Sequence, residues 1–240
     1  MKGKFFAPDL SDKRIIYAIN DLEKMGYARV DFESNADFVL LGVNPDKKYL
    51  DCNKAVFAGN IKADNIYDYT KCESFALKNA YLTAESAIAV AIDNDDESLI
   101  NNRVLIAGYG RIGKALHKLL GAYTNDITVC ARNENARTLA ECCGSSAVDF
   151  DSLKNKNDYK FVFNTVAHPV FNKDELDAMN KASLIIDLAS FPGGVDKHIA
   201  KANNIKLIAA RGLPAKYSPK TAGRIVAQTV DEMINVHKII

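Results

Sequence analysis

Three glycines with a distinctive spacing follow an apolar run in the middle of the chain. The run 103–107 precedes Gly108, Gly110 and Gly113, and a helical pattern begins within this loop. Such glycines allow a tight turn, close approach of the backbone to a pyrophosphate, and close packing of helix on strand. A helix N-terminus also stabilises an anion, because its first N–H groups lack partners. The spacing therefore predicts a dinucleotide-binding loop that includes Tyr109, Arg111 and Ile112.

The residues after the next strand bear on the choice of dinucleotide. In an NAD enzyme an Asp or Glu usually lies about 20 residues beyond the loop and binds the ribose 2′-hydroxyl. Here the strand 127–131 ends in Ala131 and Arg132 instead. An arginine can pair with a 2′-phosphate through two hydrogen bonds. The pattern favours NADP(H) and leaves NAD(H) open, and the alternative for Arg132 is a solvated residue at a strand end.

Polar and small residues also follow the later strands of the same pattern. Asn164 and Thr165 end one apolar run, and Asp187 and Ala189 end the next. Ligands of a doubly wound sheet lie outside the carboxyl ends of its strands. We therefore expect these four residues to border the cofactor, with Asp187 also ordering the glycine turn that follows it.

No residue stands out as catalytic. His168 follows Asn164 in the loop, and an imidazole titrates near neutrality, so it is a candidate general acid or base. Its alternative is a loop residue with a surface or structural role. Glu85 is the second candidate.

The element pattern predicts an α/β protein with two domains. Six strands alternate with helices from residue 103 onward, which is typical of a doubly wound parallel, or Rossmann, sheet. We expect residues 1–95 to form a smaller, shortened, flavodoxin-like α/β domain and residues 96–240 to form the dinucleotide-binding domain. Within the first, 75–77 reads as a last strand and Thr83 as the N-cap of a helix over 84–92. The last helix, opened by Ser218 and Pro219, should cross back onto the first domain and serve as a hinge.

Composition excludes several classes of function. The 240 residues include 31 basic and 30 acidic side chains, so no strong field attracts nucleic acid or a membrane. No segment reaches the roughly 18 apolar residues of a membrane helix, and no signal peptide is recognisable. The five cysteines lack metal-ligand spacing, which predicts a reducing cytoplasm, no disulfides and no metal site.

Several motifs of residues 79–240 together resemble the dipicolinate synthase A family, whose members form one of the two kinds of chain in that enzyme. They are Asn79-Ala80, Thr83-Ala84-Glu85, the Gly108 loop, Ala131-Arg132, Asn164-Thr165, Asp187-Leu188-Ala189-Ser190, Pro192-Gly193-Gly194, Gly212-Leu213-Pro214 and Ser218-Pro219-Lys220-Thr221-Ala222-Gly223. The resemblance is slight before residue 79, where the first domain is shorter than the family's. Ser86, Ala215 and His168 depart from the family's residues and leave the substrate open.

The resemblance implies an oxidoreductase of spore-forming bacteria. It implies synthesis of dipicolinate, pyridine-2,6-dicarboxylate, from a dihydrodipicolinate-type product of the lysine pathway by hydride transfer. The implied partners are a small dicarboxylate substrate and the flavoprotein-like second subunit of dipicolinate synthase, and we expect a cytoplasmic homo-oligomer. Cations, an amide and a helix N-terminus suit carboxylates. The expected substrate-binding residues are Asn79, Thr83, Lys216, Lys220 and Thr221.

Two other functions remain open at this point. One is an NAD(P)-dependent dehydrogenase of another cyclic or 2-keto acid, which the sequence cannot separate from the first. The other is a non-catalytic redox sensor that only binds the dinucleotide, although the chain lacks the basic patch of a nucleic-acid-binding sensor.

Overall fold

A computed structural model describes residues 1–63, 65–155 and 157–240 of the chain. These residues form two compact units. Unit 1 consists of Met1–Leu82 and Pro214–Ile240, and unit 2 consists of Thr83–Leu213. Each unit has its own parallel sheet.

The sheet of unit 1 has five parallel strands in the order β2-β1-β3-β4-β5. This is the order of a flavodoxin-like doubly wound sheet, in which the winding reverses between β1 and β3. The elements are β1 (Gly3–Phe6), α1 (Lys13–Lys24), β2 (Tyr27–Val30), η1 (Glu33–Asn35), β3 (Phe38–Val43), η2 (Lys47–Tyr49), β4 (Ala55–Gly59), β5 (Ile66–Asp68), η3 (Tyr69–Lys71) and α8 (Pro219–His237).

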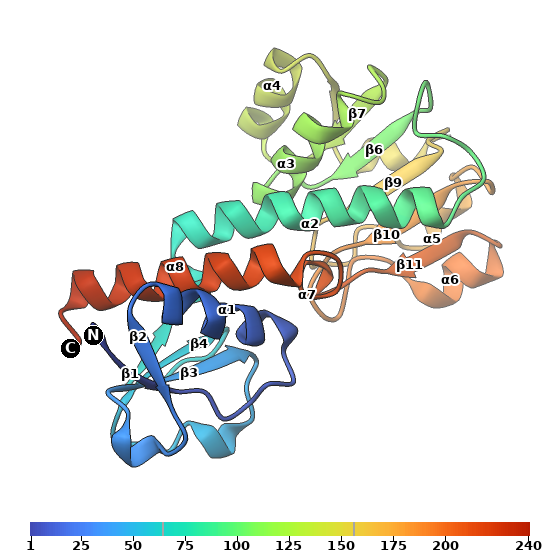
Figure 1. Cartoon of the computed structure of the whole chain (residues 1–240). Helices are drawn as coiled ribbons and strands as arrows, with labels where there is room; N and C mark the ends of the chain where they lie inside the picture. Colours follow the sequence, from blue (N-terminus) through green and yellow to red (C-terminus); the bar gives the residue numbers. More distant parts are fainter. Residues whose placement is uncertain (64, 156) are drawn as a thin grey trace. The chain divides into compact units, whose positions relative to one another are not determined.

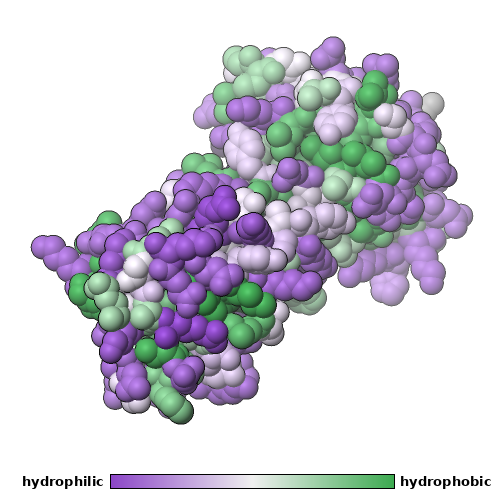
Figure 2. All heavy atoms as spheres, in the orientation of Figure 1, coloured by the Kyte–Doolittle hydropathy of each residue, from purple (hydrophilic) through white to green (hydrophobic). Residues whose placement is uncertain are grey.

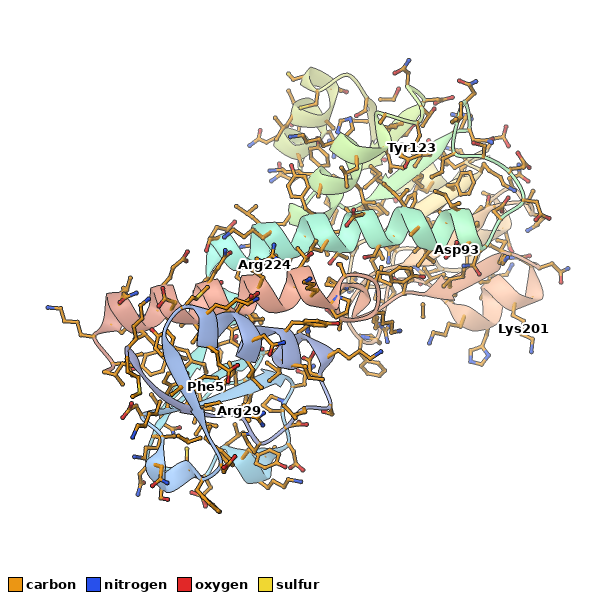
Figure 3. The ribbon with its side chains drawn as sticks, in the orientation of Figure 1. Phe5, Arg29, Asp93, Tyr123, Lys201 and Arg224 are labelled. Carbon is orange, nitrogen blue, oxygen red and sulfur yellow. The ribbon has the colours of Figure 1, made fainter. Side chains whose placement is uncertain are left out.

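Helices α1 and α8 pack against each other within unit 1 (Figure 1). The buried face of α1 includes Ile15 and Leu22, and α8 adds Val226 and Val230 to the same core, which also holds Phe5. Figure 3 labels Phe5 and also Arg224, whose Nε lies 3.7 Å from the carboxylate of Asp21 on α1. The C-terminal helix therefore crosses back onto the first unit, as the sequence predicts.

The sheet of unit 2 has six parallel strands in the order β11-β10-β9-β6-β7-β8, which is the Rossmann order. All six predicted strands are confirmed. Figure 1 shows α3 beside β6 and α6 beside β11. The elements are β6 (Val104–Ala107), α3 (Arg111–Leu120), β7 (Ile127–Cys130), α4 (Glu134–Cys142), β8 (Ser146–Val148), η4 (Asp151–Lys154), β9 (Phe161–Asn164), α5 (Lys173–Asp177), β10 (Leu184–Asp187), α6 (Lys197–Ala202) and β11 (Lys206–Ala209).

Two helices contain the points where the chain passes between units. Helix α2 (Glu73–Asp93) begins in unit 1, and α7 (Leu213–Tyr217) begins at the last residue of unit 2. The predicted strand over 75–77 and the predicted N-cap at Thr83 are wrong, because α2 already includes both. The last strand of unit 1 is instead β5, which the sequence pattern did not indicate.

The division into units differs from the expected domains 1–95 and 96–240. Contacts place the first division after Leu82, inside α2, and return residues 214–240 to unit 1. The physical reason is that the apolar side chains of α8 complete the core of unit 1. Among the described residues, the core of unit 2 consists of side chains between Ala84 and Leu213.

No helix in the described ranges is long and apolar enough to cross a membrane. Figure 2 shows hydrophilic side chains spread over the visible faces of both units. Cys142 and Cys143 are exposed, whereas Cys130 is buried.

Candidate functional site

The loop between β6 and α3 depends on two glycines for its shape. Gly108 has a φ of +93°, and a Cβ there would lie 2.3 Å from Oγ1 of Thr165. A Cβ at Gly113 would lie 2.1 Å from the carbonyl oxygen of Gly108. Both positions therefore exclude a side chain. Gly108 makes the turn, and Gly113 lets α3 pack closely on it, as the sequence predicts.

Gly110 is different, because nothing in the described protein crowds it. It is exposed, its φ of −81° suits any residue, and a Cβ there would have no atom within 4 Å. It precedes the first turn of α3, where Arg111 is exposed and Ile112 is partly exposed. The open space in front of Gly110 is thus free for a ligand, and the adjacent helix N-terminus favours an anionic one.

The side chain of Tyr109 is fixed against the same helix. Its hydroxyl lies 2.7 Å from Nδ1 of His117 on α3. Burial is the main cause and the proximity of Cys143 the smaller cause that raise the pKa of Tyr109 to about 12, so the phenol is neutral at physiological pH. Burial also lowers the pKa of His117. This pair was not predicted, because Tyr109 lies in the loop before α3 and no helical spacing relates it to His117.

Arg132 lies exposed after β7, beside buried Ala131. Arg137 holds this turn, since its Nη1 donates to the carbonyl oxygens of Ala131 at 2.7 Å and Arg132 at 2.8 Å. Within the described ranges, no hydrogen bond or ion pair engages the Arg132 guanidinium. It borders a pocket of about 220 Å³ together with Phe150, Asp151, Lys154, Val166, His168, Pro169, Val170, Asn172 and Glu175.

Asn164 and Asp187 form a buried pair at the ends of neighbouring strands. Nδ2 of Asn164 donates to Oδ1 of Asp187 at 2.8 Å, and neither side chain is more than 1% exposed. The Asp187 carboxylate also accepts from the backbone N–H of Ala189 at 3.2 Å and of Gly194 at 3.4 Å. These side chains are occupied in fixing the loops after β9 and β10. Thr165 is likewise occupied, with its hydroxyl donating to the carbonyl oxygen of Ala107 at 2.9 Å.

The two candidate acids or bases lie on exposed surface of unit 2. Glu85 is on α2, and His168 is in the loop that borders the Arg132 pocket. Among the residues that the structure describes, no hydrogen bond or ion pair orients either side chain. Neither has the positioned partner that an efficient general base needs.

The five predicted substrate-binding residues belong to three helices, α2, α7 and α8. Asn79 and Thr83 lie four residues apart on α2, Asn79 in unit 1 and Thr83, which is buried, in unit 2. Lys220 and Thr221 are exposed in the first turn of α8. Lys216 borders a second pocket, of about 500 Å³ and wholly within unit 1, together with Ser11, Asp12, Lys13, Arg14, Val43 and Ala215. The sequence did not indicate that Lys216 meets the start of α1.

Comparisons with known proteins agree with this fold. Residues 90–213 match the family described as shikimate / quinate 5-dehydrogenase. Dipicolinate synthase A of Bacillus subtilis (strain 168), one subunit of that enzyme, is 31% identical over 214 residues, which cover 84% of this chain and 71% of that protein. The crystal structure of dipicolinate synthase A from Bacillus halodurans superposes with a TM-score of 0.86 at 20% identity and covers 98% of both chains. A transhydrogenase structure from Sinorhizobium meliloti superposes with a TM-score of 0.76 at 13% identity, covering 98% of this chain and 94% of that one.

Proposed function

Since the chain belongs to the dipicolinate synthase A family, and residues 90–213 to the shikimate/quinate 5-dehydrogenase family, we propose that it makes dipicolinate from a dihydrodipicolinate-type precursor with NADP(H). Its membership makes it a dinucleotide-binding protein of the dehydrogenase type. The main support for the proposal is the open space at Gly110. This residue has no side chain, and no described protein atom outside its two chain neighbours lies within 4 Å of where its Cβ would be.

The residues of unit 2 fit a nicotinamide dinucleotide. Gly110 leaves room for a pyrophosphate, and the first N–H groups of α3 can bind it. Arg132 has its guanidinium available for a 2′-phosphate, which supports NADP(H) over NAD(H). We assign Asn164, Asp187 and Ala189 to the loops that border the cofactor, where their bonds to each other fix the backbone.

The proposed reaction needs little acid or base chemistry from the protein. When bound, NADP⁺ supplies the acceptor for the hydride that leaves the dihydropyridine ring, and the ring becomes aromatic as a proton passes to water. The protein has to orient the ring and bind its two carboxylates. This is consistent with the exposed, unoriented positions of Glu85 and His168, for which we propose no role in the chemical step.

The function has a direct test in the product. The purified chain, alone and with a flavoprotein-like second subunit, is incubated with freshly generated dihydrodipicolinate and NADP⁺, and dipicolinate is followed by its ultraviolet absorbance. We expect product with NADP⁺ and a lower rate with NAD⁺. Absence of product in both preparations, together with turnover of another cyclic acid such as shikimate, would replace this proposal by the second dehydrogenase function.

We also propose a flavoprotein-like partner chain, assembly into a homo-oligomer and a cytoplasmic location. The name of the Bacillus subtilis relative describes it as one subunit of its enzyme, which supports a partner of a second kind. Gel filtration with and without that partner tests both kinds of assembly, and fractionation of cells tests the location.

Arg132→Asp should change the preference from NADPH toward NADH. The substitution removes a cation that can pair with the 2′-phosphate and adds a carboxylate that repels it but can accept from a 2′-hydroxyl. Loss of one charge-assisted contact costs about 1.5 to 3 kcal/mol, so NADPH affinity should fall by roughly ten- to a hundredfold. Titrations of both dinucleotides measure the ratio of their dissociation constants.

The matched control for this change is Lys201→Asp, which alters the charge of unit 2 by the same amount at an exposed position on α6 (Figure 3). It should leave the ratio unchanged. An unchanged ratio in Arg132→Asp as well would mean that Arg132 is only a solvated residue.

A further inference from the structure

We propose that the pocket of unit 1 bordered by Lys13 and Lys216 is a binding site for a small dicarboxylate, with these two ammonium groups as its cationic contacts. The identification of this dicarboxylate as the substrate rests on the proposed function. The site differs from the one predicted from the sequence. It includes residues at the start of α1, and Lys220 and Thr221 do not line its pocket.

The pocket lies where a doubly wound sheet binds its ligands. Ser11 to Arg14 follow β1 at the start of α1, and Val43 is the last residue of β3. In the order β2-β1-β3-β4-β5 the winding reverses between β1 and β3, and the crevice at the carboxyl ends of those strands is the usual ligand site of such a sheet. The position of the pocket is therefore that of a ligand site on topological grounds alone.

One charged pair in the pocket is already neutralised. Arg14 binds both oxygens of the Asp12 carboxylate, with Nη2 2.7 Å from Oδ2 and Nε 2.9 Å from Oδ1. The backbone N–H of Arg14 and of Val43 also donate to this carboxylate, at 3.0 and 3.4 Å. Burial opposes ionisation of Asp12, but the bonds and charge of Arg14 outweigh it and keep the pKa of Asp12 below its ordinary value.

The remaining charges of the pocket are both positive. Lys13 and Lys216 are exposed, and within the part of the chain that the structure describes neither ammonium group has a hydrogen bond or an ion pair. They come from segments about 200 residues apart and meet the same pocket through the packing of α8 on α1. Two unpaired cations beside a neutralised pair give a local excess of positive charge, which attracts an anion.

The size and lining of the pocket favour a ring diacid over a simple ion. Its volume is about 500 Å³, far more than one carboxylate or phosphate needs, since a water molecule occupies about 30 Å³ of liquid. Val43 and Ala215 offer apolar contacts for a ring, and Ser11 offers a hydroxyl. Two cations match two carboxylates. Dipicolinate and its dihydro precursor have this chemistry.

The test uses calorimetric titration of the full-length chain with dipicolinate in metal-free buffer, because dipicolinate chelates metals. Lys13→Ala and Lys216→Ala should each weaken binding by roughly tenfold. This is the lower end of the range for losing a charge-assisted contact, because both ammonium groups are at exposed sites. Lys24→Ala, at the opposite end of α1, is the matched control and should change nothing. NADPH affinity should stay constant in all variants, because unit 2 is unchanged, and an unchanged thermal unfolding curve shows that unit 1 is folded.

Three results would overturn the site. They are equal affinity for inorganic phosphate and dipicolinate, unchanged affinity in both pocket variants, or a loss of affinity in Lys220→Ala that the pocket variants lack. Kinetics separate this failure from that of the proposed function. If Lys13→Ala and Lys216→Ala still produce dipicolinate and their KM for the dihydro precursor is unaltered, the function is retained and the site is rejected. If the chain binds dipicolinate and both lysine variants weaken that binding, but no dipicolinate is produced, the site is retained and the proposed function is rejected.

Discussion

Gly110→Val is expected to abolish dinucleotide binding while the chain stays folded. The open surroundings of this residue and its ordinary φ mean that valine fits the protein without a clash. Glycine also makes no side-chain cap to α3, so replacing it costs about 1 kcal/mol or less of stability. The added methyl groups occupy the space in front of the helix N-terminus, which is where the backbone must meet a pyrophosphate.

The expected loss of affinity is large. Blocking two charge-assisted contacts, at about 1.5 to 3 kcal/mol each, lowers NADPH affinity by roughly a hundredfold or more. Calorimetric titration measures the affinity, and thermal unfolding followed by circular dichroism measures the fold. Undiminished affinity in a folded variant would show that the pyrophosphate does not approach Gly110.

Two other glycines calibrate this experiment. Gly121 lies at the other end of α3, where a Cβ would have ordinary contacts at 3.6 Å or more, so Gly121→Val should retain NADPH affinity. Gly113→Val should instead destabilise unit 2, because its Cβ would lie 2.1 Å from the Gly108 carbonyl oxygen. The three variants together distinguish a glycine needed by a ligand from a glycine needed by the fold.

Gly223→Leu should detach α8 from α1 within unit 1. A Cβ at Gly223 would lie 2.4 Å from the carbonyl oxygen of Arg14 and 3.0 Å from the backbone nitrogen of Ala18. These are backbone atoms of α1, which cannot move aside without displacing the whole helix. Overpacking of this kind costs about 3 kcal/mol, and the helices also lose the contacts that bury Val226 and Val230.

Hydrogen exchange can locate this effect. We expect faster exchange over residues 219–237 and over α1, with exchange in β6, β7 and β9 unchanged because unit 2 has a separate core. Glu232→Leu, at an exposed position on the same helix, should alter stability by no more than about 0.5 kcal/mol. Equal protection of α8 in wild type and Gly223→Leu would show that the two helices tolerate a wider separation.

The sequence predicted unit 2 well because its signals are local. Each strand is a short apolar run, and Gly113 is required by its contact with the Gly108 carbonyl oxygen, within a single strand-loop-helix segment. The predictions for unit 1 were poorer. Strand β5 is only three residues long and partly exposed, and the start of α2 mimics a strand because Phe75 and Leu77 alternate with smaller residues.

The site residues, too, could be predicted only where the signal in the sequence is local. The roles that we propose for Gly110 and Arg132 rest on their positions after a strand, which the sequence reveals. The burial of Asn164 against Asp187 and the meeting of Lys216 with Lys13 depend on tertiary packing between distant segments. No pattern within either segment carries that information, so these arrangements required the structure.

The two-segment composition of unit 1 bears on how the protein is synthesised. The ribosome completes residue 82 and then all of unit 2 before it makes residues 214–240. At about 5 to 20 residues per second, the delay is roughly ten seconds. During that time Ile15 and Leu22 of the nascent chain lack the helix that covers them, and exposed apolar surface of this kind attracts chaperones or promotes aggregation. Unit 2 can fold in the meantime, so the segment made first reaches its native state last.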